Sequence, residues 1–222
     1  MRVNGLSTEW GEVDVRTAAE AKPDAILVPK VSAPGDLHAI ERMLGAADPS
    51  IAVWAMVETP AAILNVASIA AAGGRLACFV MGTNDLIKEI RGVHTPDRLN
   101  LAAALGLSVL AARANAIAVI DGVYNDIQNT DGFSAACEQA RAFGFDGKTL
   151  IHPTQVAPCN MVFAPSAAEV EDARKLIAAF ELPQNKGKGA IKLDGRMVEL
   201  LHAEIARRTV AMADAIAALE AA

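Results

Sequence analysis

Short runs of apolar residues alternate along the chain with longer stretches rich in alanine. The short runs are continuously apolar, a pattern typical of strands that helices cover on both faces. They predict strands over residues 2–4, 25–31, 51–58, 76–82, 117–124 and 148–152, with helical stretches such as 60–72, 99–112 and 132–143 between them. This alternation of strand and helix predicts an α/β fold built on a parallel sheet.

The number of predicted strands bears on the architecture. A complete (β/α)8 barrel needs eight strands and usually ~250 residues, whereas this chain of 222 residues supplies six. Six units also suit an open doubly wound sheet. However, no GxGxxG follows the first strand and GxxxxGK[ST] occurs nowhere, so the sequence lacks the phosphate loops of nucleotide-binding folds. Polar residues at the strand ends favour a barrel, where they would meet at one mouth.

The chain changes character after residue 152. Residues 164–181 form a predicted helix, because Ser166 can cap its first turn and Glu169 stands three residues later in a capping box. A loop rich in glycine and lysine follows, and a last helix is predicted from about residue 200 to 221. We therefore expect an incomplete barrel of six units over residues 1–163. Residues 164–222 would form a helical extension that covers a barrel end or contacts a neighbouring subunit.

Composition excludes several classes of protein. Aromatic residues make up only 4% of the chain and the net charge is −6, so the sequence offers neither stacking platforms nor a basic field for nucleic acid. No apolar run reaches the ~18 residues of a membrane span. Cys78, Cys137 and Cys159 are widely spaced without a CxxC pair, which argues against a disulfide framework or a zinc site. These features predict a soluble cytoplasmic protein.

Charged and amide side chains gather where the predicted strands end. They are Arg2, Asn4, Lys30, Glu58, Asn84, Asp85, Asn125, Asp126 and His152. Glu58 and Asp85 end adjacent predicted strands, and neighbouring strands lie ~4.8 Å apart in a sheet. Two such carboxylates repel each other unless a cation or a proton lies between them, and oxygen-only ligands favour Mg²⁺ or Mn²⁺. The alternative is a pair of solvated acids in the first turns of helices, where acids are favoured.

Two basic residues belong to the same predicted mouth. The planar guanidinium of Arg2 suits a substrate carboxylate, although a solvated terminal residue is the simpler alternative. Lys30 lies inside the apolar stretch ILVPKV, an unusual place for a surface lysine, so we predict that it binds substrate. His152 is expected to be a hydrogen-bonded structural residue, and Asp121 to shape its loop through Gly122.

Six motifs resemble those of one protein family in content and in order. They are RVNGLSTEWG, ILVPKV, WAMVETP, FVMGTNDL, AIDGVYNDI and GFDGKTLIHPTQV, and the likeness covers essentially the whole chain. The chain resembles the citrate lyase β-subunit-like family of acyl-CoA lyases, within the HpcH/HpaI aldolase superfamily, which includes malyl-CoA and citramalyl-CoA lyases. The motifs are specific for the family and leave the substrate open.

The resemblance implies a TIM barrel that binds Mg²⁺ through the glutamate of ETP and the aspartate of GTND, which are Glu58 and Asp85 here. It implies that Arg2, in RVN, contacts carboxylates of the substrate. A homo-oligomer, either a trimer or a dimer of trimers, is the assembly that the family suggests. The backbone amides beside the bound acid would be those of Gly82, Thr83 and Asn84.

The implied substrate is a 3-hydroxy-3-carboxyacyl-CoA thioester of the malyl, citramalyl or citryl type. Retro-Claisen cleavage of its carbon–carbon bond would yield acetyl-CoA and a 2-keto acid. Three alternatives remain. The enzyme could hydrolyse the same thioesters, or it could be a citryl-thioester lyase subunit that works on an acyl-carrier protein. The third alternative is a catalytically weak subunit that binds CoA esters or supports assembly.

Two departures from the family pattern affect the expected chemistry. In related lyases an aspartate in a G-x-M-x-D element, delivered by a neighbouring subunit, acts as acid and base. This chain reads GRMVE, so Glu199 is the candidate acid/base, and the alternative is a solvated residue that opens the last helix. The family also has two further strand–helix units before RVN. We therefore predict a barrel that lacks its first two βα units and exposes two sheet edges.

Overall fold

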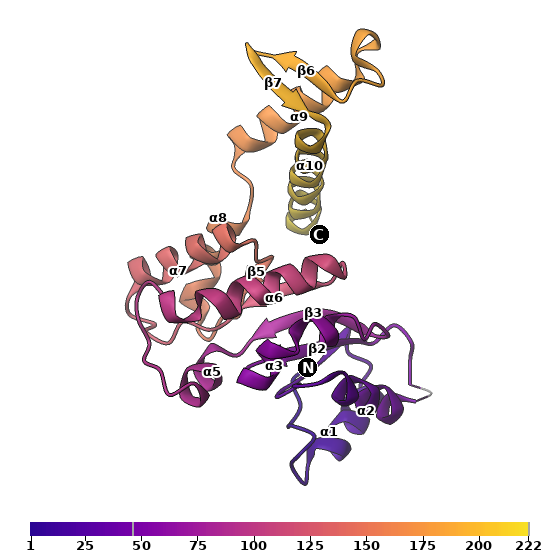
Figure 1. Ribbon diagram of the computed structural model, residues 1–222, viewed down its shortest axis with the longest axis vertical. Helices are drawn as coiled ribbons and strands as arrows, with labels where there is room; N and C mark the ends of the chain where they lie inside the picture. The colour runs from indigo at the N-terminus through magenta and orange to yellow at the C-terminus, as the bar shows by residue number, and fades with distance from the viewer. Residues whose placement is uncertain (46, 222) are drawn as a thin grey trace. The chain divides into compact units, whose positions relative to one another are not determined.

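The computed structural model describes residues 1–45 and 47–221. These residues fall into two compact units, Met1–Cys159 and Asn160–Ala222 (Figure 1). The division lies inside helix α8 (Val156–Phe163). Among the residues that the structure describes, no helix combines the length and the apolar character that crossing a membrane requires.

The first unit is built on a parallel sheet of five strands. In chain order they are β1 (Ala25–Val28), β2 (Ala52–Val57), β3 (Leu76–Met81), β4 (Ala118–Asp121) and β5 (Gly147–Lys148). The order within the sheet is the same, β1-β2-β3-β4-β5, and Arg2 adds an isolated parallel bridge to Leu27 at the β1 edge. A doubly wound sheet reverses its strand order at a switch point. The sequential order seen here is that of a barrel, which confirms the predicted α/β class. Four predicted strands, over residues 25–31, 51–58, 76–82 and 117–124, contain β1 to β4. The other two predictions were wrong in extent, because residues 2–4 form only the bridge at Arg2 and β5 shares only Lys148 with the strand predicted over 148–152.

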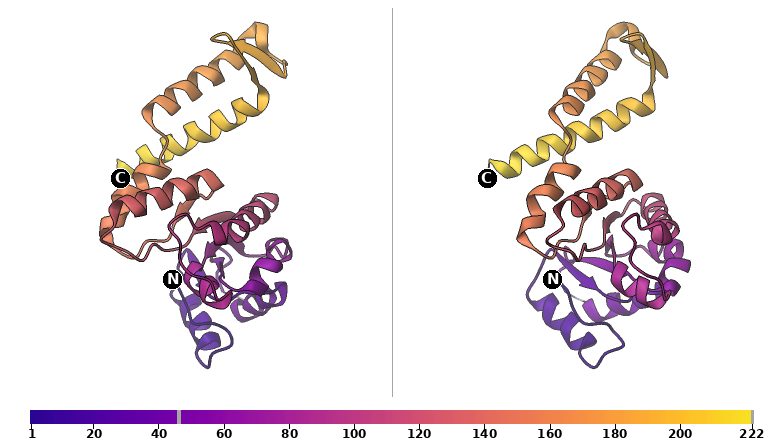
Figure 2. Two further views of the ribbon diagram at one scale, coloured as in Figure 1. Left: turned by 60° about the vertical axis from the view of Figure 1, so that its left-hand side comes forward. Right: turned by 90° about the vertical axis from the view of Figure 1, so that its left-hand side faces the viewer.

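Helices follow the strands in the first unit and lie along the outside of the sheet (Figure 2). They are α1 (Gly11–Glu20), α2 (Pro34–Leu44), α3 (Pro60–Leu64), α4 (Val66–Ala70), α5 (Thr83–Glu89), α6 (Ala102–Ala114), α7 (Thr130–Phe143) and α8, with short 3-10 turns at Leu99–Leu101 and Pro153–Gln155. The single helix predicted over residues 60–72 is therefore two helices, which meet at Asn65. The stretches predicted over 99–112 and 132–143 correspond to α6 and α7.

The two faces of the sheet differ in burial. Along β2, Val53, Ala55 and Val57 are buried beneath the helices, whereas Trp54 and Met56 on the opposite face are partly exposed. The same alternation occurs in β1. The prediction of burial on both faces was therefore wrong for these two strands, because helices cover only their outer face. Parallel register places the side chain of Glu58, which continues the series of Trp54 and Met56, on the inner face.

The second unit consists of two helices and a small hairpin. Its elements are α9 (Ala167–Glu181), a 3-10 turn (Pro183–Asn185), the antiparallel strands β6 (Ala190–Leu193) and β7 (Arg196–Glu199), and α10 (Leu200–Glu220). Phe180, Ile191 and Ala203 form its buried cluster. The predicted capping box is confirmed, because the Ser166 amide donates to Glu169 Oε2 at 2.7 Å and the Glu169 amide to Ser166 Oγ at 3.2 Å.

Candidate metal and substrate site

Glu58 stands at the junction between β2 and α3, where the backbone has little freedom. Val57 is the last residue of the strand, and Thr59 already caps the helix, since its hydroxyl accepts from the Ala62 amide at 3.0 Å. Pro60, with its fixed φ, opens the helix. The Glu58 side chain is only 3% exposed. A carboxylate is therefore held, almost entirely buried, at the carboxyl end of β2.

Gly82 provides the room for the Glu58 side chain. It follows β3 and its amide donates to the Val57 carbonyl at 3.0 Å, which extends the pairing of the two strands by one residue. A Cβ at this position would overlap the Glu58 side chain and would lie 2.5 Å from Oε2. The glycine of GTND is therefore required by the close approach of the carboxylate rather than by an unusual φ.

Asp85 lies in the first turn of α5, which begins directly after Gly82. Its carboxyl group lies close enough to that of Glu58 for each to shift the pKa of the other. Burial, and next the charge of Asp85, raise the pKa of Glu58. A hydrogen bond from Lys30 lowers the pKa of Asp85. The two carboxyl groups form a close, unequal pair, with Glu58 the more easily protonated partner.

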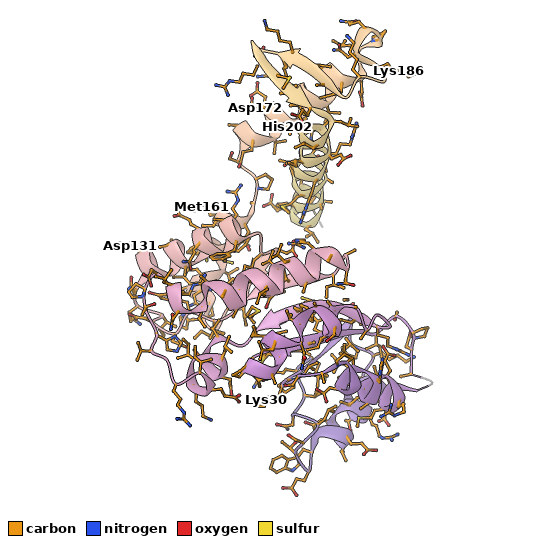
Figure 3. The ribbon with its side chains drawn as sticks, in the orientation of Figure 1. Lys30, Asp131, Met161, Asp172, Lys186 and His202 are labelled. Atoms are coloured by element: carbon orange, nitrogen blue, oxygen red, sulfur yellow. The ribbon has the colours of Figure 1, made fainter. Side chains whose placement is uncertain are left out.

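Lys30 contacts both carboxylates of this pair. Its amide donates to Glu58 Oε1 at 2.9 Å, and its Nζ donates to Asp85 Oδ1 at 2.7 Å. Glu89 Oε1 lies 3.9 Å from the same Nζ. The hydrogen bond with Asp85 raises the pKa of Lys30, so the ammonium stays charged. Lys30, labelled in Figure 3, is the residue that joins the loop after β1 to the carboxylates after β2 and β3.

Arg2 lies on the same face of the sheet as the Glu58 side chain. It bridges to Leu27, which pairs in register with Trp54, so all three side chains point to the inner face. Together with Met1 and residues 23–25 they line a cavity of about 320 Å³, whose lining does not include Lys30, Glu58 or Asp85. The charge of Arg2 contributes, after larger effects, to lowering the pKa of Glu58. An exposed guanidinium therefore stands within electrostatic range of the carboxylate pair.

The remaining predicted residues lie in two different places. Thr83 is buried. Asn84 Nδ2 donates to Asn125 Oδ1 at 3.1 Å, and Asn125 Nδ2 donates to Asn84 Oδ1 at 2.8 Å, so these two side chains join α5 to the loop after β4. Glu199 belongs to the second unit, where it precedes α10 and its amide donates to His202 Nδ1 at 3.0 Å. The proposed roles of these residues stay predictions.

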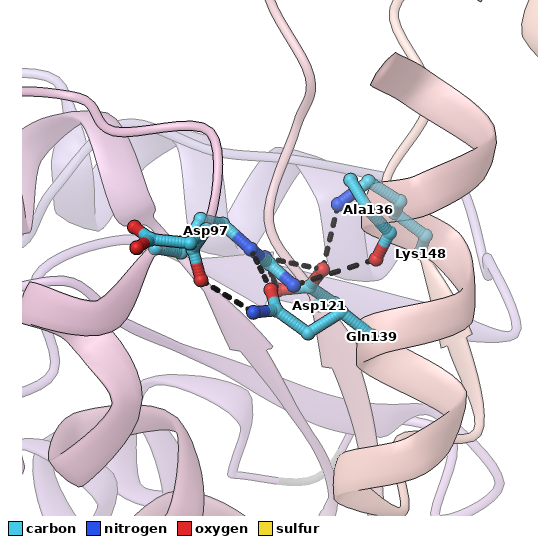
Figure 4. Close-up of polar contacts among 6 residues, drawn as sticks. Asp97, Asp121, Ala136, Gln139 and Lys148 are labelled. Carbon is cyan, nitrogen blue, oxygen red and sulfur yellow. Dashed lines mark hydrogen bonds and ion pairs between the residues drawn. The ribbon is translucent and has the colours of Figure 1, made fainter. Parts of the chain in front are cut away.

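Sequence reasoning missed a buried cluster on the outer face of the sheet (Figure 4). Asp121 is fully buried and accepts from Arg98 Nη1 at 2.7 and 2.9 Å and from Lys148 Nζ at 2.6 Å. The expectation that Asp121 shapes its own loop was wrong, because its carboxylate joins β4, β5 and the segment before α6. The available signal was an aspartate that ends the apolar run AVID, followed by a lysine at the start of the next predicted strand. His152, as expected, is hydrogen-bonded, to Thr154 at 2.8 Å.

The donor set suits a hard divalent cation. Within residues 1–45 and 47–221 no group of three or more His, Cys, Asp or Glu side chains could hold a metal ion. The close pair of carboxylates offers oxygen atoms only, and Mg²⁺ is usually bound by one or two carboxylates, with water and substrate oxygens completing its octahedron. Glu58 and Asp85 fit that requirement, whereas a structural zinc site would need more protein ligands.

Comparison with known proteins identifies the family and supports the fold. Residues 1–153 match the sequence profile of the family described as HpcH/HpaI aldolase/citrate lyase. The chain belongs to this family. The predicted family is thereby confirmed, and the chain is a member of a family of enzymes.

Two curated members of the HpcH/HpaI aldolase/citrate lyase family illustrate the range of similarity. The chain is 52% identical over 221 residues to a (3S)-malyl-CoA thioesterase of Cereibacter sphaeroides, a match that covers 100% of this chain and 76% of the relative. It is 32% identical over 206 residues to the citrate lyase β subunit of Escherichia coli, covering 90% of this chain and 68% of that subunit.

A solved structure of the family supports the fold. The CitE protein of Mycobacterium tuberculosis, in complex with magnesium, acetoacetate and coenzyme A, superposes with a TM-score of 0.74 at 25% identity. The match covers 95% of this chain and 77% of that one. The predicted fold of TIM-barrel type is therefore confirmed.

Proposed function

We propose that this protein is a Mg²⁺-dependent enzyme that hydrolyses the thioester of a malyl-type CoA ester. The observation that carries the proposal is the 52% identity, along the whole chain, to a (3S)-malyl-CoA thioesterase. The arrangement of Arg2, Lys30, Glu58 and Asp85 on one side of the sheet supports it. The metal, the substrate and the reaction are all parts of this proposal.

The chemistry of the site matches a 2-hydroxy acid group. Glu58 and Asp85 would hold the cation, and Mn²⁺ is the natural substitute for Mg²⁺ at such a pair. Arg2 would pair its planar guanidinium with the carboxylate of the malyl group. When bound, a divalent cation would neutralise the carboxylate pair and polarise the hydroxyl and carboxylate oxygens of the substrate. The site thereby selects CoA esters that carry a hydroxyl and a carboxylate on one carbon.

Hydrolysis would use water as the nucleophile. Water would add to the thioester carbonyl and the carbon–sulfur bond would break, so malyl-CoA would yield malate and free CoA. The attacking water must lose a proton, and a carboxylate near the thioester is the suitable base.

Carbon–carbon cleavage is the second candidate, favoured by the 32% identity to a citrate lyase β subunit. In this reaction the substrate hydroxyl loses its proton and the bond between the carbinol carbon and the methylene carbon breaks. Malyl-CoA would then yield glyoxylate and the enolate of acetyl-CoA, which takes up a proton. Glu199 is the proposed acid for that last step. A citryl-thioester lyase subunit and a catalytically weak assembly subunit remain lesser alternatives.

Product analysis separates the reactions. The purified protein should be incubated with malyl-, citramalyl- and citryl-CoA, with Mg²⁺ or with EDTA. Hydrolysis releases a free thiol and malate, whereas cleavage releases glyoxylate and acetyl-CoA without a free thiol. We expect thiol release from malyl-CoA that requires Mg²⁺ and is abolished in Glu58→Gln. Turnover that persists in EDTA would refute the metal site, and binding of the esters without turnover would favour the assembly subunit.

A further inference from the structure

Lys30 adopts a backbone conformation that lysine rarely occupies. It follows β1 in the loop that leads to α2, and its φ is 57°. This left-handed region brings Cβ close to the following carbonyl oxygen, so only glycine enters it freely. A lysine held there without a compensating contact would be disfavoured. The contacts that Lys30 makes therefore indicate the role of this backbone conformation.

The conformation directs two donors of one residue at two different carboxylates. The Lys30 amide reaches Glu58 Oε1 at 2.9 Å, and the ammonium reaches Asp85 Oδ1 at 2.7 Å. Each carboxylate thus has one oxygen bound to Lys30, which leaves Glu58 Oε2 and Asp85 Oδ2 as the oxygens that Lys30 does not engage. The exposed fractions of the Lys30 and Asp85 side chains are 46% and 41%, so the ion pair lies at an open edge of the site.

The loop around Lys30 is anchored independently of these carboxylates. The Ser32 hydroxyl bonds the Thr59 hydroxyl at 2.8 Å, and Asn65 Nδ2 donates to the Ser32 carbonyl at 2.9 Å. The Asp36 side chain accepts from the Ser32 amide at 2.8 Å. These contacts fix the backbone on the carboxyl side of Lys30 against α3. The position of its amide therefore does not depend on the flexible end of the side chain.

We propose that Lys30 is a positioning residue for the metal site rather than a substrate-binding residue. Its amide and its ammonium hold one oxygen of each carboxylate, so that the other oxygen of each faces a shared cation. The ammonium also offsets the repulsion between the two carboxylates while the site forms. Residues that orient metal ligands in this way typically change metal affinity by roughly 10–100-fold when they are replaced. This inference rests on the proposed Mg²⁺ site.

Lys30→Gly distinguishes the contribution of the Lys30 side chain from that of its backbone amide. Glycine accepts a φ of 57° without strain and keeps the amide that bonds Glu58, so the fold should be retained. The whole side chain is lost, including the ammonium that bonds Asp85. We expect the Mg²⁺ dissociation constant, measured by calorimetry on the folded protein without substrate, to rise roughly 10–100-fold. Lys30→Met, which keeps the apolar stem but not the charge, should give the same direction.

Lys22 is the matched control. It is a lysine in the same unit with a φ of 49°, and it lies outside the candidate site. Lys22→Gly should leave the Mg²⁺ affinity of the protein unchanged. An affinity that is unchanged or tighter in both Lys30 variants would overturn the positioning role. If the unaltered protein binds no Mg²⁺, the proposed metal site itself fails, and that result is distinct from a failure of the Lys30 inference.

Discussion

At the scale of single residues, the GTND glycine controls how closely two strand ends approach. Gly82→Ala would place a methyl group against the Glu58 carboxylate, in a region where the neighbouring backbone is fixed by Thr59 and Pro60. We expect a loss of about 1–3 kcal/mol in the free energy of unfolding, together with weaker Mg²⁺ binding, because the carboxylate must move. Denaturant unfolding and metal titration would measure the two effects.

Gly35→Ala is the control for that substitution. A Cβ at Gly35, inside α2, would meet no atom within 4 Å. Alanine should therefore be neutral or stabilising there by up to about 1 kcal/mol. If Gly82→Ala is equally well tolerated, the Glu58 carboxylate is not confined as the structure indicates.

The burial of Glu58 predicts a specific pH dependence. Burial and the charge of Asp85 raise the folded-state pKa of Glu58, so the folded protein binds this proton more tightly than the unfolded chain. The ionised Glu58 therefore lowers stability above its unfolded pKa, and the penalty vanishes as the pH falls below that value. In EDTA at pH 7, Glu58→Gln should raise the free energy of unfolding by about 0.5–2 kcal/mol. With Mg²⁺ present, the same substitution should abolish turnover.

The same measurement at low pH provides the check. Near pH 3.5 the unaltered protein carries Glu58 largely protonated, so the difference between it and Glu58→Gln should shrink towards zero. Asp85 behaves oppositely, since its lowered pKa means that its contribution to stability is lost as the pH falls. A stability difference that does not depend on pH would show that the Glu58 charge is not the cause.

At the scale of elements, a buried ion cluster holds the carboxyl ends of β4 and β5 together. Asp121 has two cationic partners, Arg98 and Lys148, whose side chains are 13% and 1% exposed. Gln139 on α7 also binds Arg98, accepting from its Nε at 2.6 Å. Asp121→Asn would leave the buried cations without a counter-charge. We expect a loss of about 3–5 kcal/mol, measured by denaturant unfolding of the whole chain.

An exposed ion pair in the same unit serves as the comparison. Glu12 and Arg16 form an i,i+4 pair on α1 with side chains 59% and 58% exposed. Glu12→Gln should change the free energy of unfolding by no more than about 0.5 kcal/mol, because solvent screens such pairs. Equal effects of the two substitutions would mean that burial does not distinguish the clusters.

Individual helices and strands differ in how well they can be predicted from the sequence. Strand positions follow from continuous apolar runs, and α9 follows from its capping box. A helix at Asp85 was expected, but its bounds were not, because α5 has only seven residues, TNDLIKE, too few for a clear helical period. The β6–β7 hairpin was missed although Asp194 and Gly195, with φ of 49° and 80°, carry the Asp-Gly turn signal.

At the scale of the whole molecule, the sequence predicts which residues form the candidate site better than it predicts how they are arranged. The motifs identified Glu58, Asp85, Arg2 and Lys30, all of which lie on one side of the sheet. They did not reveal that Lys30 binds both carboxylates, because that depends on a left-handed backbone at one residue. The role of Glu199 is also beyond local pattern, because it depends on how separate units and subunits assemble.

The proposed role of Glu199 depends on how the subunits assemble. Helix α10 exposes Leu201, Ile205 and Leu219, apolar side chains that a neighbouring subunit could cover. If Glu199 completes the site of another subunit, chains carrying Glu58→Gln and chains carrying Glu199→Gln should each lack carbon–carbon cleavage. Mixed by unfolding and refolding together, they should regain activity, since about a quarter of the sites in a random oligomer combine both intact glutamates. Assays of the mixture, with light scattering to establish a trimer or a dimer of trimers, test this. If both variants are inactive and stay inactive when mixed, Glu199 and Glu58 of each site lie on one chain. If the Glu199→Gln variant is active alone, Glu199 takes no part in the reaction.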